Sequence, residues 1–177
     1  MEIYEEIRTD REHGARRMVA AYKDRLYSAA LMFGCEAHDA EDLVFRTFAQ
    51  ALAKIRHFKP RGEGDSFRNW LFRILVNFRR MDLRKSRRRI ELVFPDALPE
   101  AASPEPDGFA RLAAKADAGR VRAAVARLPE GLRAAVVLRY FEDMPTPEIA
   151  ALLQIPEGTV RSRLHYAKAL LHSFLNV

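Results

Sequence analysis

Cysteine is nearly absent from this chain of 177 residues, in which Cys35 stands alone. One cysteine makes no internal disulfide and no multi-cysteine zinc site, which fits the reducing cytoplasm. No apolar run approaches the roughly 20 residues of a membrane span. Residues 1–6 (MEIYEE) also lack the basic and then apolar pattern of a signal peptide. We therefore expect a cytoplasmic protein with no metal ion and no membrane insertion.

Enzyme motifs are missing too. The sequence holds no glycine-rich phosphate-binding motif, no HExxH and no Gly-x-Ser-x-Gly. Acidic residues gather at Asp39, Glu41 and Asp42, but they stand where a helix is expected to begin. Helix capping explains acids at that place better than metal-dependent cleavage does. The sequence therefore predicts no catalytic residue and no cofactor.

Charge is plentiful and unevenly placed. The net charge is +6, and residues 1–90 carry 20 Lys/Arg against 13 Asp/Glu. Residues 91–119 carry 2 against 6, and residues 120–177 carry 8 against 5. Two basic regions separated by an acidic one suggest two DNA-contacting domains, joined by a linker that DNA repels.

The hydrophobic periodicity is helical almost throughout. Apolar residues recur at helical spacing before Gly34, between Asp39 and Ile55, after Ser66, and again beyond Gly119. Between them, from Glu91 onward, four prolines stand among acids without any period, which is linker composition. The sequence thus predicts an all-α chain. Two small helical domains, residues 1–92 and 119–177, are joined by an acidic, Pro-rich linker at residues 93–118.

The helix expected from Ser66 to about Arg89 has a polar row opposite its apolar stripe. Steps of four and three residues place five side chains on one face: Arg73, Asn77, Arg80, Arg84 and Arg87. Arginine donates in two places to phosphates and base edges, and an amide has a donor beside an acceptor, which can read a base edge. The alternative is an ordinary solvated face. The run RKSRRR at residues 84–89 favours a bound anion, because its five cations otherwise repel one another.

The loop before this helix combines aromatic and basic residues. Phe58, Arg61 and Phe67 stand beside the expected base-reading helix, where aromatic rings can hold bases out of the stack. Equally, Phe58 and Phe67 can be core residues that close the loop. Both interpretations stay open at this point.

The end of the chain has the form of a helix-turn-helix. Thr146-Pro147-Glu148 opens one helix and Pro156-Glu157 opens the last. A recognition helix reads bases from its N-terminal residues and touches phosphates further along. Base contacts are therefore expected from Arg161 and Ser162, phosphate contacts from Arg163 and Lys168, and a contact with the flanking DNA backbone from Arg139. The alternative is a helical hairpin that does not bind DNA but has a basic exposed side.

The helix from Asp39 to Ile55 carries a different surface. Phe45 falls off its main apolar stripe, and Arg46, Gln50 and Lys54 stand between the apolar rows. An exposed aromatic residue on a charged helix suggests a protein partner. A core phenylalanine in a broad stripe is the alternative.

Three segments, in order along almost the whole chain, resemble the extracytoplasmic-function group of bacterial RNA polymerase sigma factors, of the sigma-70 class. Residues 39–44 (DAEDLV) with Thr47 and Phe48 resemble the core-binding motif of region 2. Residues 67–74 (FRNWLFRI), with Asn77 and Asp82-x-Arg84, resemble the segment that melts and reads the −10 element. Residues 128–140, 148–150 (EIA) and 158–164 (GTVRSRL) resemble region 4, the −35 reader.

The resemblance implies a role for each set of residues. Asn77 would take a flipped −10 base against a wall formed by residues 58–67. On the last helix, the residues that would face the −35 element are Arg161, Ser162 and His165. The expected polymerase contacts or their scaffold are Asp39, Asp42, Phe45, Arg46 and Phe48. The family usually carries Gln-Glu where this chain has Phe45-Arg46, a Gly where it has Gln154, and a basic residue where it has Tyr166.

The implied partners are core RNA polymerase, promoter DNA and an anti-sigma protein. Two other functions fit parts of the pattern. A stand-alone helix-turn-helix regulator leaves the row around Asn77 without a purpose. A sigma mimic that binds only an anti-sigma protein is expected to have lost its basic readers, whereas Arg80, Arg161 and Arg163 are present.

Overall fold

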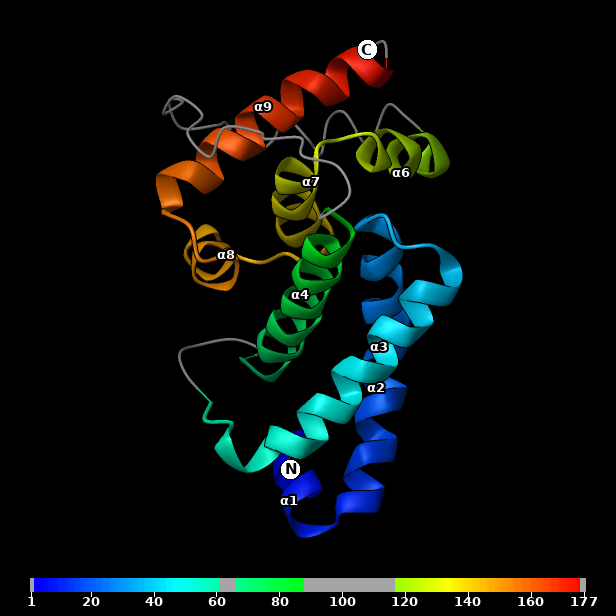
Figure 1. Cartoon of the computed structure of the whole chain (residues 1–177). Helices are drawn as coiled ribbons and strands as arrows, with labels where there is room; N and C mark the ends of the chain where they lie inside the picture. Colours follow the sequence, from blue (N-terminus) through cyan, green and yellow to red (C-terminus); the bar gives the residue numbers. More distant parts are fainter. Residues whose placement is uncertain (1, 61–65, 88–116, 176–177) are drawn as a thin grey trace. The chain divides into compact units, whose positions relative to one another are not determined.

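A computed structural model describes residues 2–60, 66–87 and 117–175, and all regular structure in these ranges is helical (Figure 1). One compact unit contains α1 (Ile3–Thr9), nearly all of α2 (Arg11–Met32), α3 (Ala37–Lys54), the short η1 (Ile55–His57) and α4 (Ser66–Arg87). The other contains α6 (Ala118–Ala126), α7 (Glu130–Val136), the π-helical η2 (Val137–Phe141), α8 (Thr146–Leu153) and α9 (Glu157–Leu175). The all-α prediction is confirmed. Residues 88–116, which hold most of the predicted linker, lie outside the described residues, so the domain boundaries stay a prediction.

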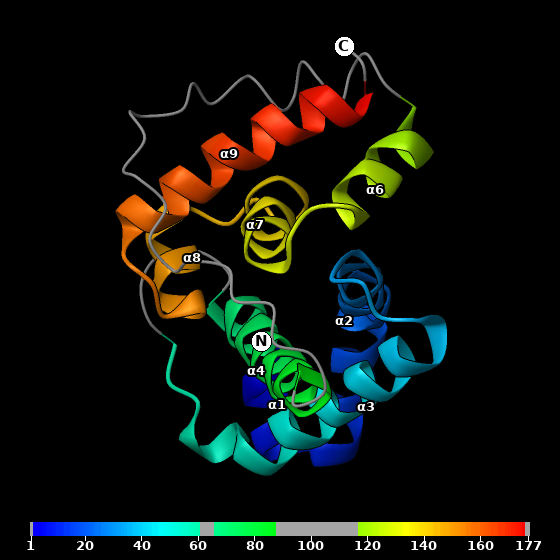
Figure 2. The same ribbon diagram turned by 45° about the horizontal axis from the view of Figure 1, so that its top comes forward.

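The core of the first unit lies between α3 and α4, which run side by side in both views (Figures 1 and 2). The apolar residues of α3 recur at helical spacing, and those facing inward are buried: Ala40, Leu43, Val44, Phe48 and Ala51. On α4 the buried hydrophobic residues are Phe67, Leu71, Phe72, Leu75 and Val76. The Thr47 hydroxyl is also buried and donates to the Leu43 carbonyl at 2.7 Å, so its polar group is satisfied within the helix.

A seven-residue helix at the N-terminus, α1, has no counterpart in the periodicity of the sequence. Its first turn is fixed by a capping box between Glu2 and Glu5. The chain then turns sharply into α2, and a Cβ at Gly14 would lie 2.4 Å from the Ile7 nitrogen. Only glycine permits this approach of two backbones. Glu6 is buried at the same corner and forms an ion pair with Arg17.

The second unit is built around α9, which contacts α6, α7 and α8. The face of α9 that packs into this core carries apolar residues at helical spacing: Val160, Leu164, Ala167 and Leu171. Gln154 ends α8 in the left-handed conformation, with φ 56° and ψ 46°. This residue makes the turn between the two helices of the helix-turn-helix, a position at which glycine is common because it has no Cβ.

Candidate nucleic-acid interface

The predicted polar row lies along one face of α4. The side chains of Arg73, Asn77 and Arg84 are exposed and that of Arg80 is half-buried, while Leu71, Phe72, Leu75 and Val76 are in the core. Arg61 and the side chain of Arg87 lie outside the described residues. The predicted face therefore exists, and its binding of DNA stays a prediction.

The two phenylalanines of the preceding loop are buried in an aromatic cluster. Phe58 and Phe67 are 5% and 4% exposed, with ring centroids 5.3 Å apart. Around them stand the half-buried rings of Tyr4, Tyr22 and Trp70, at 4.9 to 6.0 Å. Neither phenylalanine presents a free face on which a base can stack. As direct base contacts the two are therefore corrected to core anchors, because the rings around them exclude other partners.

Trp70 is a candidate that the sequence interpretation missed. Its hydrophobic character and helical spacing place it with the apolar stripe, yet it is half-buried and precedes Arg73 by three residues and Asn77 by seven. These steps extend the polar row by one turn toward the start of α4. The spacing was available in the sequence. Trp70 was missed because tryptophan counts as hydrophobic in a sequence pattern, although its large ring can be partly buried and still face solvent.

Arg8 also escaped notice, and it fixes the place where the loop begins. Its guanidinium donates to the backbone carbonyls of Ile55, at 3.2 Å, and Phe58, and it lies 5.5 Å from the centre of the Tyr4 ring. Helix ends leave carbonyls without partners inside the helix. After α3, Arg8 binds the Phe58 carbonyl and also the Ile55 carbonyl, which accepts a hydrogen bond from the Phe58 N–H as well, so Arg8 ties α1 to the beginning of the loop. No local sequence pattern indicates these hydrogen bonds, because Arg8 lies 47 residues before Ile55 and 50 residues before Phe58.

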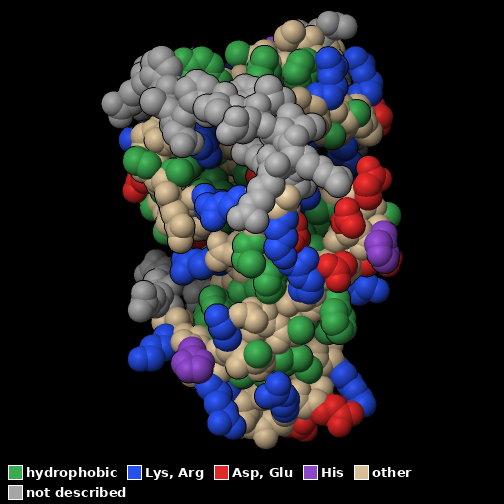
Figure 3. All heavy atoms as spheres, viewed as in Figure 1, with side chains coloured by type: hydrophobic (Ala, Val, Ile, Leu, Met, Phe, Trp, Pro, Cys, Tyr) green, Lys and Arg blue, Asp and Glu red, His purple; other side chains and the backbone are tan. Residues whose placement is uncertain are grey.

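The predicted polymerase-facing helix, α3, shows a mixed surface. Asp39 and Asp42 are exposed at its beginning, where acidic side chains gather (Figure 3). Phe45 is 72% exposed, so the alternative of a core phenylalanine is wrong. Phe48 is 7% exposed and belongs to the core, so it is scaffold and not contact surface.

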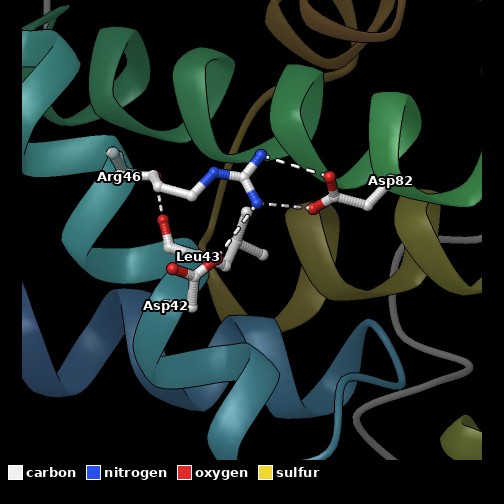
Figure 4. Close-up of polar contacts among 5 residues, drawn as sticks. Asp42, Leu43, Arg46 and Asp82 are labelled. Carbon is white, nitrogen blue, oxygen red and sulfur yellow. Dashed lines mark hydrogen bonds and ion pairs between the residues drawn. The ribbon is translucent and has the colours of Figure 1, made fainter. Parts of the chain in front are cut away.

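Arg46 is engaged within the first unit. Its two terminal nitrogens donate to both carboxylate oxygens of Asp82 on α4, at 3.0 and 3.2 Å, and one also donates to Asp42 at 3.1 Å (Figure 4). The guanidinium lies 4.6 Å from the centre of the Phe78 ring. The hydrogen bond to Asp82 raises the pKa of Arg46 above its ordinary value, against the effect of desolvation. A contact between Arg46 and the polymerase stays a prediction.

In the second unit, Arg161 and His165 lie one turn apart near the beginning of α9. His165 is exposed, and Arg161 forms an ion pair with Glu157 at 3.5 Å, with 40% and 48% of the two side chains exposed. Ser162 is different, because it is 1% exposed and its hydroxyl donates to the Gly158 carbonyl at 3.0 Å. Its predicted base contact is therefore corrected: the side chain is enclosed and its proton is used within the helix.

The predicted phosphate-contacting residues of this unit are half-buried. Arg139 lies in the π-helical turn and donates to the Met144 carbonyl at 3.3 Å. The guanidinium of Arg163 lies over Gly131 at the start of α7, where a Cβ would come within 3.2 Å of it. Lys168 is half-buried further along α9. Arg139 and Arg163 thus carry both a local structural contact and a charge.

Two family models match the chain, and each falls on one unit. Sigma-70 region 2 matches residues 18–89, from α2 to α4, and Sigma-70, region 4 matches residues 118–171, from α6 to α9. No helix among the described residues is long and apolar enough to span a membrane.

Curated relatives and a solved structure agree with these matches. The ECF RNA polymerase sigma factor SigE of Mycolicibacterium smegmatis is 35% identical, over 89% of this chain and 60% of SigE. The RNA polymerase sigma factor CnrH of Cupriavidus metallidurans is 32% identical, over 90% of this chain and 85% of CnrH. The structure of CnrH in complex with the cytosolic domain of CnrY is similar with a TM-score of 0.67 at 27% identity, covering 98% of this chain and 95% of CnrH.

Proposed function

The chain belongs to the extracytoplasmic-function group of the sigma-70 family, and from this membership we propose that it is a dissociable specificity subunit of RNA polymerase. It binds the core enzyme and directs transcription initiation at promoters. One observation carries this function above all: the two family matches occur in order, each on its own helical unit. The first unit reads and opens the −10 element, and the second reads the −35 element.

At the −10 element, the exposed row of α4 supplies the contacts. Arg73 and Arg84 bind phosphates, and the amide of Asn77 captures a base that has left the stack. Unstacking a base costs a few kcal/mol, which the phosphate contacts and stacking on a ring such as Trp70 offset. The buried Phe58 and Phe67 support this surface from beneath.

At the −35 element, α9 enters the major groove with its first turns. Arg161 and His165 approach base edges, and Arg139, Arg163 and Lys168 face phosphates. Arg161 first has to leave Glu157. An exposed ion pair of this kind contributes only about 0–1 kcal/mol, so it does not oppose binding strongly.

The face of α3 that carries Asp39, Asp42 and Phe45 meets the polymerase. An aromatic side chain exposed to 72% beside acids fits a contact with an apolar centre and a basic surround. The chain supplies no catalytic group and works in the cytoplasm with the core enzyme, which forms the RNA bonds. Because CnrH has been solved in complex with the cytosolic domain of CnrY, we also propose that this chain binds a protein partner besides the polymerase, the anti-sigma protein that the resemblance implies.

The test is transcription with purified core polymerase on a library of promoters. A sigma factor selects promoters with defined −10 and −35 elements. If the chain binds DNA without core enzyme and no promoter fires, it is a stand-alone regulator. If it binds neither promoter DNA nor core enzyme, it is a mimic.

Asn77→Ala adds a test of the reading residue. It is expected to lose about 1–3 kcal/mol of base preference at one −10 position, with core binding retained. An equal loss on all promoters would show that Asn77 does not read a base.

A further inference from the structure

A single arginine joins the helix that faces the polymerase to the helix that reads DNA. Arg46 lies on α3, one turn after Asp42, and binds Asp82 on α4 (Figure 4). It also lies against the ring of Phe78, a second residue of α4. Phe78 and Asp82 are themselves one helical turn apart. Arg46 therefore contacts both ends of one turn of α4, with its guanidinium carbon 4.6 Å from the centre of the Phe78 ring and its two terminal nitrogens on the Asp82 carboxylate.

The position of this turn links it to the reading row. Asn77 immediately precedes Phe78, and Arg80 and Arg84 stand two residues before and after Asp82. The carboxylate of Asp82 is 33% exposed and the Arg46 side chain 31%, so the pair is partly shielded from water. A bidentate pair that is partly shielded from water fixes the relative orientation of the two side chains as well as the distance between them. A single hydrogen bond does not fix both.

The charges in this region single out Asp82. It is the one acid in α4, a helix with seven Lys/Arg residues. An acid on a helix that approaches phosphates weakens DNA binding unless a cation offsets it. Arg46 supplies that cation from the other helix, which leaves the basic row of α4 attractive to DNA.

We propose that Arg46 is a positioning residue for −10 recognition: through Asp82 and Phe78 it fixes the turn of α4 that carries Asn77, so that the polymerase-facing and base-reading helices act as one rigid frame. This inference rests on the proposed function. It concerns a side chain whose predicted role was a contact with the polymerase. Arg46 touches neither base nor polymerase in this role.

The experiment measures promoter opening by holoenzyme on two promoters that share a −35 element and differ by one −10 base. The ratio of the two opening rates is the readout, because it is independent of the fraction of active protein. A loss of folded molecules slows both promoters equally and leaves the ratio unchanged. Core binding and binding to −35 duplex are measured beside it.

Asp82→Ala distinguishes positioning from simple electrostatics. If Arg46 positions α4, the ratio falls about tenfold, as for the loss of a hydrogen-bonded charge pair, although removal of an acid strengthens DNA binding in general. If Asp82→Ala strengthens both promoters equally and keeps the ratio, the proposal is overturned. Arg46→Lys keeps the charge but loses the planar fork, so it is expected to lower the ratio as well.

Two further variants complete the set. The exchange of Arg46→Asp with Asp82→Arg restores a pair between the helices and is expected to recover part of the ratio. If it behaves no better than Asp82→Ala, the pair is not what positions α4. The control is Arg16→Gln, which removes an exposed pair with Glu12 on α2 and leaves the ratio unchanged.

The wild-type protein separates this inference from the function on which it rests. If wild-type holoenzyme opens neither promoter while −35 duplex binding persists, the proposed function fails. If wild-type holoenzyme discriminates between the promoters and every variant does so equally well, only the positioning role fails.

Discussion

Helix α4 of the first unit and the bundle of short helices in the second unit use their arginines differently. In the first, Arg73 and Arg84 are exposed along a 22-residue helix. In the second, Arg133 donates twice to the Leu128 carbonyl, at 2.8 and 3.2 Å, Arg139 donates to Met144, and Arg120 donates to Leu175 at 3.2 Å. Short helices have many ends, and each end leaves carbonyls without partners inside the helix. In the second unit, arginines bind the Leu175 carbonyl at the end of α9 and the Leu128 and Met144 carbonyls in the connections between helices.

This difference limits what a count of basic residues says about DNA binding. A long helix separates its polar face from its core face by periodicity alone, so the row of α4 is visible in the sequence. In a bundle of short helices, arginine serves both to bind backbone carbonyls and to contact DNA. The comparison predicts that variants of the first unit act on DNA more directly than their counterparts in the second.

The largest expected effect concerns a glycine in each unit. Gly14→Ala places a methyl group 2.4 Å from the Ile7 backbone nitrogen, and neither backbone can yield, so we expect a loss of about 3 kcal/mol of stability. Gly131→Ala meets only the flexible guanidinium of Arg163, at 3.2 Å, and is expected to stay within about 1 kcal/mol of wild type. Urea unfolding measures both.

Tryptophan fluorescence assigns the change to a unit, because the single tryptophan, Trp70, lies in the first. For Gly14→Ala we expect the fluorescence midpoint to fall. An unchanged midpoint would mean that the corner between α1 and α2 opens without affecting the aromatic cluster.

The next effect compares two neighbours in the second unit. Arg161→Ala is expected to lose about 1–3 kcal/mol at one −35 position. Ser162→Ala should leave base preference unchanged, since its hydroxyl is enclosed and bonded to Gly158. Binding to a set of −35 duplexes with single-base changes measures both. Uniform weakening by Arg161→Ala would make it a phosphate contact, and a change of preference in Ser162→Ala would contradict its assignment to the interior.

Arg161 and Ser162 also show which features of a site the sequence alone does not predict. The helical wheel places Ser162 beside Arg161, but it does not reveal that a short side chain can turn back to the carbonyl four residues earlier. The fold class and the row around Asn77 were predictable because they depend on local periodicity. Helix α1 was not, because seven residues give little period. It is held by distant partners, through Gly14, Arg17 and the aromatic cluster.

The roles of Phe58 and Phe67 also could not be predicted from the sequence alone. The sequence left both as either base contacts or core anchors, and composition cannot separate these roles. Their burial depends on Tyr4 and Tyr22, which come from α1 and α2. Arg46 likewise looked like a surface residue until α4 brought Asp82 beside it. Each of these side chains was misread or left open because its partner is far away in sequence.

A smaller effect tests the arginine comparison through salt dependence. Arg84→Ala in the first unit removes an exposed cation and should reduce the slope of log K against log salt for promoter binding by about 0.7–0.9, as for one phosphate contact. Arg139→Ala should change that slope less, because its guanidinium already donates to Met144. Holoenzyme binding across a salt series measures both. Equal slopes for the two variants would show that the units use arginine alike.

The smallest effect concerns the turn of the helix-turn-helix, where Gln154 has φ 56°. A left-handed conformation strains a residue with a Cβ by roughly 1–2 kcal/mol, and glycine relieves this strain but adds about 0.4–1 kcal/mol of chain entropy on unfolding. Gln154→Gly is therefore expected to stabilise the second unit by about 1 kcal/mol, net of these opposing effects. Ala151→Gly, at an exposed and right-handed position of α8, is the matched control and should destabilise it by a similar amount.

Circular dichroism follows both variants of this turn, and Trp70 fluorescence should not change, since it reports the other unit. If Gln154→Gly raises and Ala151→Gly lowers the free energy of unfolding of the second unit, the backbone conformation at each position, and not glycine itself, determines the effect. If Gln154→Gly destabilises as Ala151→Gly does, the side chain of Gln154 makes a contact that outweighs the strain of its backbone. A side-chain contact would then stabilise this turn, just as hydrogen bonds to backbone carbonyls fix the arginine side chains of the second unit.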